Sequence, residues 1–358
     1  MKVLKLGSYA LFSCTAAAML SGCVGSQPPN SLPGTVPQNQ MMDTHGDRSV
    51  FGKDRTQCPC LYVTNLNHDS VTVYASGATG NVRPIQEISG SKTGLSHPHD
   101  VAVDKTGNIY VVNVAPASVT VYPPGATGNV KPEATIRGAS TQLEEPTGIA
   151  INPGTGDIYV SNIAGGSSMS GSVTIYAAGS SGDVAPLGVI QGSNTRLLHP
   201  NCLALDARGN VAVTNVHLAK GYQQGWLTFY AAGSTGNIAP TRVIQGALTK
   251  IDLPTQITLD SKQNTYLANY DGDDLTVYDA GANGNVAPIV DIHGRRTKLG
   301  SAFGVAIDRA GNIYAASGIA GNSRITVYTS GSDGNVRPVK VIAGSHTSLD
   351  FPQGIAVH

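Results

Sequence analysis

One unit occurs six times along this chain. The phrase Gly-Asn-Val-x-Pro recurs with small variations, and a tyrosine stands ten residues before the proline in every copy. The prolines are Pro84, Pro132, Pro186, Pro240, Pro288 and Pro338, and the tyrosines are Tyr74, Tyr122, Tyr176, Tyr230, Tyr278 and Tyr328. Neighbouring prolines are 48 to 54 residues apart. A repeat of this length with four short alternating apolar runs predicts the blade of a β-propeller.

The copy between residues 98 and 136 shows the four runs, which we call strands a to d. They are His99–Asp104, Ile109–Val112, Ser118–Tyr122 and the segment around Ala134–Ile136. Gly107-Asn108 supplies the positive-φ residues of the a to b hairpin. An aspartate precedes this turn in four copies, at Asp104, Asp206, Asp260 and Asp308. We expect these carboxylates to accept hydrogen bonds from the turn's backbone amides.

The two ends of the repeat region complement each other. It begins at Leu61–Asn65, a strand b without a strand a, and ends at Ile355–His358, a strand a without a strand b. The last strand should therefore complete the first blade and close the ring. The predicted fold is all-β: a six-bladed propeller with four-stranded blades over residues 58–358.

The repeats also resemble known families. Pro352–Val357 and Ala306–Tyr314 are similar to NHL repeats, and Leu61–Asn65 through Ser70–Tyr74 resembles the YVTN type of propeller repeat. The resemblance covers residues 61–358. Asparagine replaces the aspartate usual in NHL repeats at Asn65, Asn113, Asn162, Asn215 and Asn269, and serine replaces it at Ser317. Both families include interaction modules and a minority of enzymes, so the resemblance implies the fold and leaves the function open.

The first 22 residues have the order of a secretory signal: Lys2 and Lys5, an apolar stretch, then small residues. Leu20-Ser21-Gly22-Cys23 resembles the lipobox of bacterial lipoproteins, which implies cleavage before Cys23 and its acylation. An ordinary signal peptide with a chance cysteine is the alternative. Val24, in place of the aspartate typical of lipoproteins kept at the inner membrane, favours the outer membrane, on its periplasmic or surface side. Residues 23–57, rich in proline and polar residues, form the predicted disordered tether.

Charge excludes one class of partner. The chain has 23 Lys+Arg against 23 Asp+Glu, and charged residues make up 13% of it. It lacks the basic run or stripe on which nucleic-acid binding depends. Nucleic acid is therefore not expected as a partner.

The start of strand a is where the copies differ. Its first two positions should line the mouth of the central channel, and their polar members are His99, Asp100, Asn201, Gln256 and Gln353. Because these positions vary while their neighbours repeat, they are candidate ligand-binding residues. They contain one carboxylate and one imidazole, fewer ligands than Ca²⁺ or a three-ligand zinc site requires. A structural polar pair is the alternative role for His99 and Asp100, and no metal or other cofactor is predicted.

Insertions fall in the b to c connection. Asn113 and Val119 are six positions apart, whereas the equivalent residues are 11 apart from Asn162 to Val173 and 12 apart from Asn215 to Leu227. These two longer connections should rise beside the channel mouth. The second contains His217, Tyr222 and Trp226, which are candidate ligand-binding residues; a solvated insertion without a partner is the alternative.

The sequence therefore predicts a lipid-anchored propeller of the bacterial cell envelope. The leading hypothesis is a non-catalytic module that binds a protein, peptide or glycan on the face of the b to c loops. The alternative is a metal-dependent enzyme, similar to propeller lactonases and lyases, that works at the channel mouth.

Overall fold

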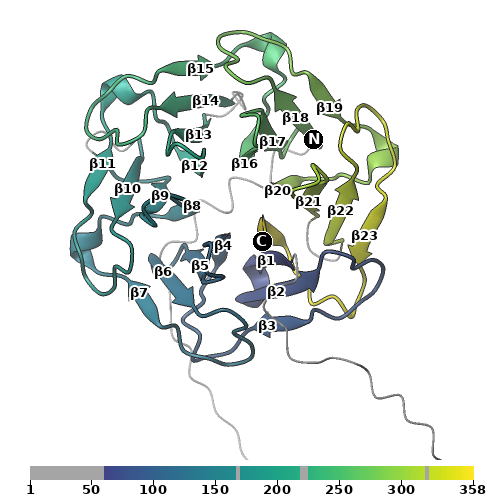
Figure 1. The fold of residues 1–358 in the computed structure, drawn as a ribbon, viewed down its shortest axis with the longest axis horizontal. Coiled ribbons are helices and arrows are strands. Elements are labelled where there is room, and N and C mark those ends of the chain that lie inside the picture. The colour runs from purple at the N-terminus through teal and green to yellow at the C-terminus, as the bar shows by residue number, and fades with distance from the viewer. Residues whose placement is uncertain (1–59, 167–169, 218–224, 319–321) are drawn as a thin grey trace, which may run out of the picture. The chain divides into compact units, whose positions relative to one another are not determined.

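Six four-stranded antiparallel sheets surround a central axis in the computed structural model (Figure 1). The structure describes residues 60–166, 170–217, 225–318 and 322–358. The predicted signal, the tether, Cys23 and Tyr222 lie outside these residues. The all-β six-bladed propeller predicted from the repeats is confirmed. No helix in the described part of the chain is long and apolar enough to span a bilayer.

Each sheet is one blade, and its strands run from the axis outward in the order a, b, c, d. Blade 1 consists of β24 (Pro352–Val357), β1 (Cys60–Asn65), β2 (Ser70–Ala75) and β3 (Gln86–Ile88). Blade 2 consists of β4 (Pro98–Val103), β5 (Ile109–Asn113), β6 (Ser118–Tyr122) and β7 (Ala134–Ile136). Blade 3 consists of β8 (Pro146–Ile151), β9 (Ile158–Asn162), β10 (Ser172–Tyr176) and β11 (Gly188–Ile190).

The second half of the ring repeats this order. Blade 4 consists of β12 (Pro200–Leu205), β13 (Val211–Val216), β14 (Gly225–Tyr230) and β15 (Arg242–Ile244). Blade 5 consists of β16 (Pro254–Leu259), β17 (Thr265–Asn269), β18 (Asp274–Tyr278) and β19 (Val290–Ile292). Blade 6 consists of β20 (Ala302–Ile307), β21 (Ile313–Ser317), β22 (Arg324–Tyr328) and β23 (Lys340–Ala343). Short 3₁₀ turns are η1 (Leu66–His68), η2 (Ala139–Thr141), η3 (Ser193–Thr195), η4 (Ala247–Thr249) and η5 (Arg295–Thr297).

The last strand closes the ring as predicted. β24 pairs antiparallel with β1, and the backbones of Cys60 and His358 exchange two hydrogen bonds of 2.8 and 3.0 Å. The innermost strands contact one another in the cycle β4, β8, β12, β16, β20, β24 and back to β4. Closure therefore gives blade 1 its innermost strand and gives every innermost strand a neighbour on both sides.

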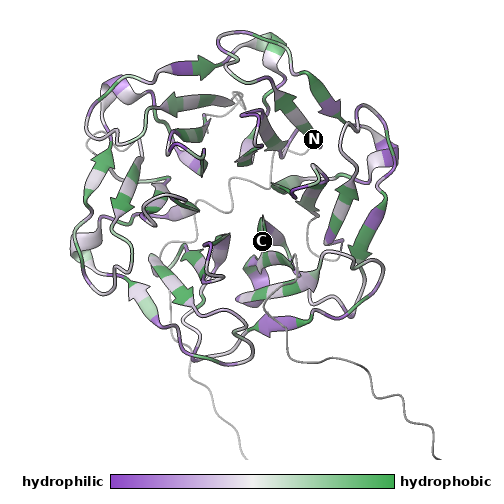
Figure 2. Ribbon diagram, viewed as in Figure 1, coloured by the Kyte–Doolittle hydropathy of each residue, from purple (hydrophilic) through white to green (hydrophobic). Residues whose placement is uncertain are grey.

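The hydrophobic core is divided among the junctions between blades. Each of its six clusters joins side chains of two neighbouring sheets, such as Val71 and Val73 of blade 1 with Val101 and Val111 of blade 2. The green, hydrophobic residues of Figure 2 accordingly lie mainly on the strands. Propeller stability thus depends on every blade having two neighbours.

The repeated tyrosine and asparagine both bind the connection that enters their own blade from the preceding one. The tyrosine of strand c is fully buried, and its hydroxyl donates to a threonine carbonyl of that d to a connection, as from Tyr122 to Thr93 (2.7 Å). The asparagine of the Gly-Asn-Val-x-Pro phrase accepts from a backbone amide of the same connection, as Asn129 does from Lys92 (2.7 Å). Both bonds recur in all six blades, with Asp183 in place of asparagine in blade 3. The invariant spacing in the sequence therefore encodes the contacts between blades.

The aspartates of the a to b turns do what the sequence predicts. Asp104 Oδ1 accepts from the amides of Thr106 (2.8 Å) and Asn108 (3.0 Å). Asp206, Asp260 and Asp308 make the same pair of bonds in their own turns.

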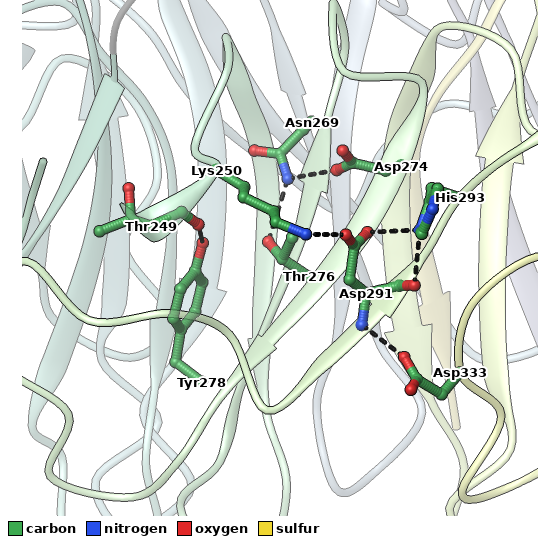
Figure 3. Close-up of polar contacts among 9 residues, drawn as sticks. All are labelled: Thr249, Lys250, Asn269, Asp274, Thr276, Tyr278, Asp291, His293 and Asp333. Atoms are coloured by element: carbon green, nitrogen blue, oxygen red, sulfur yellow. Dashed lines mark hydrogen bonds and ion pairs between the residues drawn. The ribbon is translucent and has the colours of Figure 1, made fainter. Parts of the chain in front are cut away.

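A second asparagine, at the end of strand b, fastens strand c to the d to a connection in five blades. In blade 5 the Asn269 amide donates to Asp274 (2.7 Å) and Thr276 (3.0 Å), and its oxygen accepts from the amide of Asp252 (3.3 Å); Figure 3 shows the two donated bonds. Blade 6 has Ser317 at this position. Its hydroxyl and that of Thr326 are buried without a hydrogen-bond partner among the described residues. The serine is too short to bridge the gap that asparagine spans elsewhere.

We predict that Ser317→Asn stabilises the protein. The new amide would donate to Thr326 and accept from the backbone of Gly300, adding about 1 kcal/mol to the free energy of unfolding. Asn113→Ser in blade 2 is the matched reverse change and should lower stability by a similar amount. Chemical denaturation of the two variants measures both effects. Shifts of the same sign in the two variants, or a loss for Ser317→Asn with a gain for Asn113→Ser, would show that this asparagine does not secure the blade.

Candidate functional site

The first two residues after the head of strand a converge on the axis, as the sequence predicts. They line one pocket at the end of the ring where the b to c and d to a connections lie, which we call the mouth face. The lining residues are His99, Asp100, Thr147, Asn201, Cys202, Thr255, Gln256, Phe303, Gln353 and Gly354. The volume open to the centre of a water molecule is about 10 Å³. That is room for about one water molecule, so the pocket accommodates a single small group.

Asp100 and Gln256 meet across the axis and together bind all six blades. The Gln256 amide of blade 5 donates to Asp100 Oδ1 of blade 2 over 2.9 Å. Asp100 Oδ2 accepts from the Ile149 amide of blade 3 (3.1 Å) and from the Cys202 thiol of blade 4 (3.4 Å). Gln256 Oε1 accepts from the amides of Val305 in blade 6 (2.9 Å) and Ile355 in blade 1 (3.2 Å). We call these two side chains the axial pair.

Glycine gives the axial pair its space. A Cβ on Gly354 would lie 2.4 Å from Asp100 Oδ1, and one on Gly148 would lie 2.6 Å from the Cα of Cys202. Both distances are far below normal contact. Gly354 therefore leaves room for Asp100, and Gly148 lets its strand approach the backbone of blade 4.

Burial dominates the electrostatics of Asp100, which is 3% exposed. Loss of solvation raises the pKa of its carboxyl to about 6, although hydrogen bonds from the Ile149 and Val101 amides favour the charged form. Burial, and secondarily the charge of Asp100, also raises the pKa of the Cys202 thiol. Cys202 is buried, and its thiol donates to Asp100.

An upper ring of side chains surrounds the pocket above the axial pair. In blades 2 to 5 each donates to a backbone carbonyl of the next blade. The bonds run from His99 Nδ1 to Thr147 (2.8 Å), Thr147 to Pro200 (3.4 Å), Asn201 to Pro254 (3.4 Å) and Thr255 to Ala302 (3.0 Å). Burial lowers the pKa of His99 to about 4, so its imidazole is neutral at pH 7, with Nδ1 donating and Nε2 left as the acceptor.

The cycle of bonds between blades stops in blades 6 and 1. Phe303 has no polar group, and Gln353, only 4% exposed, has an amide nitrogen without a hydrogen-bond partner in the part of the chain that the structure describes. Phe303 also packs against Tyr270 and Phe351, with ring centroids 4.6 and 5.1 Å apart. The sequence predicted Gln353 as a site residue but not Phe303, because only the polar residues at these positions were candidates for ligand binding.

The loop candidates are not all loop residues. Trp226 lies in β14, opposite Asn215, and its indole nitrogen donates to the Arg196 carbonyl (3.0 Å). His217 follows β13 and is half-buried. The second b to c connection therefore ends before Gly225, earlier than predicted, and Trp226 belongs to strand c with its indole bound to a neighbouring connection.

Charged side chains of blade 5 gather around Asp291. Asp291 bridges Lys250 (2.7 Å) and His293 (3.2 Å), as Figure 3 shows. Burial raises the pKa of Asp274 to about 6 against the opposing hydrogen bond from Asn269, and the charge of Asp291 adds to the rise. The acidic run Asp271–Asp274 lies where the turn from β17 enters β18. Within the described residues, no three His, Cys, Asp or Glu side chains are grouped as metal ligands would be.

Known proteins resemble this chain in fold. No family model matches its sequence, and no curated protein matches it. A protein of unknown function from Bacteroides caccae superposes with a TM-score of 0.59 at 11% identity, over 84% of this chain and 99% of that one. A chain of a nidogen/laminin complex superposes with a TM-score of 0.57 at 13% identity, over 83% and 97%. At these identities the likeness establishes the propeller fold alone.

We predict that His99 and Asp100 have opposite effects on the pH dependence of stability. The raised pKa of Asp100 adds stability at pH values below 4 that is lost as the pH rises through about 6. The lowered pKa of His99 adds stability above about pH 6.5 that is lost as the pH falls through about 4. The two contributions largely cancel in the natural protein.

Single variants separate the two contributions. Relative to the natural protein, Asp100→Asn should lose stability as the pH falls from about 6.5 to 4, and His99→Gln should gain it over the same range. Urea denaturation at a series of pH values measures both slopes. Parallel curves for the two variants would contradict the assigned protonation states.

Proposed function

We propose that this protein is a lipid-anchored propeller of the cell envelope that binds a protein, peptide or glycan on its mouth face. The observation that carries the proposal is that the largest departures from the repeat lie on that face. The tyrosine and asparagine bonds between blades recur six times. The upper ring and the b to c connections differ among blades. So does the strand c residue that pairs with the asparagine position of strand b: it is serine in blades 1 to 3 and Trp226, Asp274 and Arg324 in blades 4 to 6. A symmetric scaffold with one irregular face is suited to asymmetric recognition.

The state of the axial pair supports a binding function rather than a catalytic one. Both Asp100 oxygens accept hydrogen bonds from the protein, and both ends of the Gln256 amide are bound. A metal or substrate that bound Asp100 or Gln256 would have to displace hydrogen bonds that join all six blades. Residues His99, Asn201, Gln353, His217, Tyr222 and Trp226 remain the proposed contacts with the ligand.

Anchoring rests on the lipobox-like sequence, and the similarity to NHL and YVTN repeats belongs to the same proposal. We predict that the protein expressed in a bacterium with labelled palmitate incorporates the label and fractionates with the outer membrane. Cys23→Ser should abolish both while the propeller still folds. A labelled Cys23→Ser protein, or an unlabelled natural protein free in the periplasm, would contradict the anchor.

We predict that partner binding depends on the mouth face. Chemical cross-linking in intact cells should yield a partner whose recovery drops at least tenfold in the variant His217→Ala/Tyr222→Ala. Lys105→Ala/Lys262→Ala, on exposed a to b turns at the opposite face, is the matched control and should leave recovery unchanged. Equal recovery from the two variants would remove the mouth face as the binding surface. Chelator-sensitive lactone hydrolysis lost in His99→Ala would favour the enzymatic alternative.

A further inference from the structure

The break in the upper ring has the chemistry of a ligand subsite. Four of the six upper-ring side chains donate to the next blade, so their role is structural. At Gln353 the cycle leaves a buried amide nitrogen without a partner. A buried donor without an acceptor destabilises a protein by about 1 to 3 kcal/mol, so natural proteins retain such groups mainly where they serve a purpose.

Gln353 has two informative neighbours in the pocket. On one side is Phe303 of blade 6, held by Tyr270 and Phe351. On the other is His99 of blade 2, whose Nδ1 donates to the Thr147 carbonyl and whose Nε2 is therefore an acceptor. The subsite thus presents one donor, one acceptor and one apolar wall around room for about one water molecule.

A hydroxyl group fits this arrangement better than other small groups. It accepts from Gln353 and donates to His99 at the same time, whereas a peptide carbonyl can only accept. A carboxylate or phosphate is disfavoured because the buried Asp100 carboxylate lies beneath the pocket. An apolar wall beside such a hydroxyl suits the face of a sugar ring.

We propose that Gln353, His99 and Phe303 form a subsite for one hydroxyl-bearing residue of a neutral saccharide. This inference rests on the proposed binding function of the mouth face and narrows its ligand from protein, peptide or glycan to glycan. The hydroxyl takes the place of the single water that the pocket has room for, and the remainder of the ligand lies across the mouth face.

The test compares two isosteric changes, one in the upper ring and one outside the pocket. Gln353→Leu removes the unpartnered amide, and Thr214→Val removes a buried hydroxyl that donates to the Thr255 carbonyl over 3.0 Å. The purified protein is titrated against an array of neutral tri- to hexasaccharides of glucose, N-acetylglucosamine, mannose and galactose. The capped peptide acetyl-Ala-Ala-Ala-amide is the comparison ligand, and thermal unfolding is followed in parallel.

The two variants should show opposite patterns. Gln353→Leu should weaken binding of the recognised saccharide at least tenfold and leave the unfolding temperature equal or higher. Thr214→Val should keep the affinity within about twofold and lower the unfolding temperature by about 3 °C.

Three results would overturn the inference. If Gln353→Leu unfolds at a lower temperature in the same way as Thr214→Val, Gln353 is a structural residue. If no neutral saccharide binds, or only the peptide does, the pocket holds water and not a sugar hydroxyl. If recovery of a cross-linked partner still depends on the mouth face, the broader proposal of a binding function stands without the saccharide subsite. If no partner depends on that face, both proposals are wrong.

Discussion

The hydrogen bond between Asp100 and Gln256 is the contact on which the centre of the ring depends. A propeller has no core on its axis, because its apolar clusters lie between neighbouring sheets. Neighbouring blades are joined at the periphery by tyrosine and asparagine bonds, but those bonds connect only adjacent sheets. Among the residues that the structure describes, the axial pair alone links blades on opposite sides, and through its other partners it reaches the remaining four.

This arrangement explains the composition of the mouth. The lower level has the axial pair in two blades and glycine in three, and a side chain in place of one of these glycines, Gly354, would occupy the space of Asp100. The upper level is free of that constraint and mostly serves to bind the next blade. Where it does not, at Phe303 and Gln353, the structure has an aromatic ring and an unpartnered amide side by side. A buried polar group that lacks the usual hydrogen-bond partner marks a place where function is expected.

Much of the fold follows from the sequence because it is repeated. The fixed distance between Tyr122 and Pro132, found again in five other copies, reveals the blade, and the mismatched ends Leu61–Asn65 and Ile355–His358 reveal the closure. The ring of candidate residues also follows, since His99, Asp100, Asn201, Gln256 and Gln353 occupy one repeat position or its neighbour. The hydrogen-bond partners of these residues cannot be read from the repeat. That Asp100 meets Gln256, 156 residues away, depends on side-chain length across the axis, and a period alone carries no such information. The same is true of Trp226, which the sequence placed in a loop and whose indole instead binds the Arg196 carbonyl.

A double-mutant cycle tests the axial pair most directly. The free energy of unfolding is measured by denaturation of the natural protein, Asp100→Ala, Gln256→Leu and the double variant. If the pair joins the blades, each single change destabilises the protein and the double variant loses about 2 kcal/mol less than the sum, because the second change no longer breaks an intact bond. Additive effects within about 0.5 kcal/mol would mean that the two side chains act independently, and the account of the ring given above would be wrong.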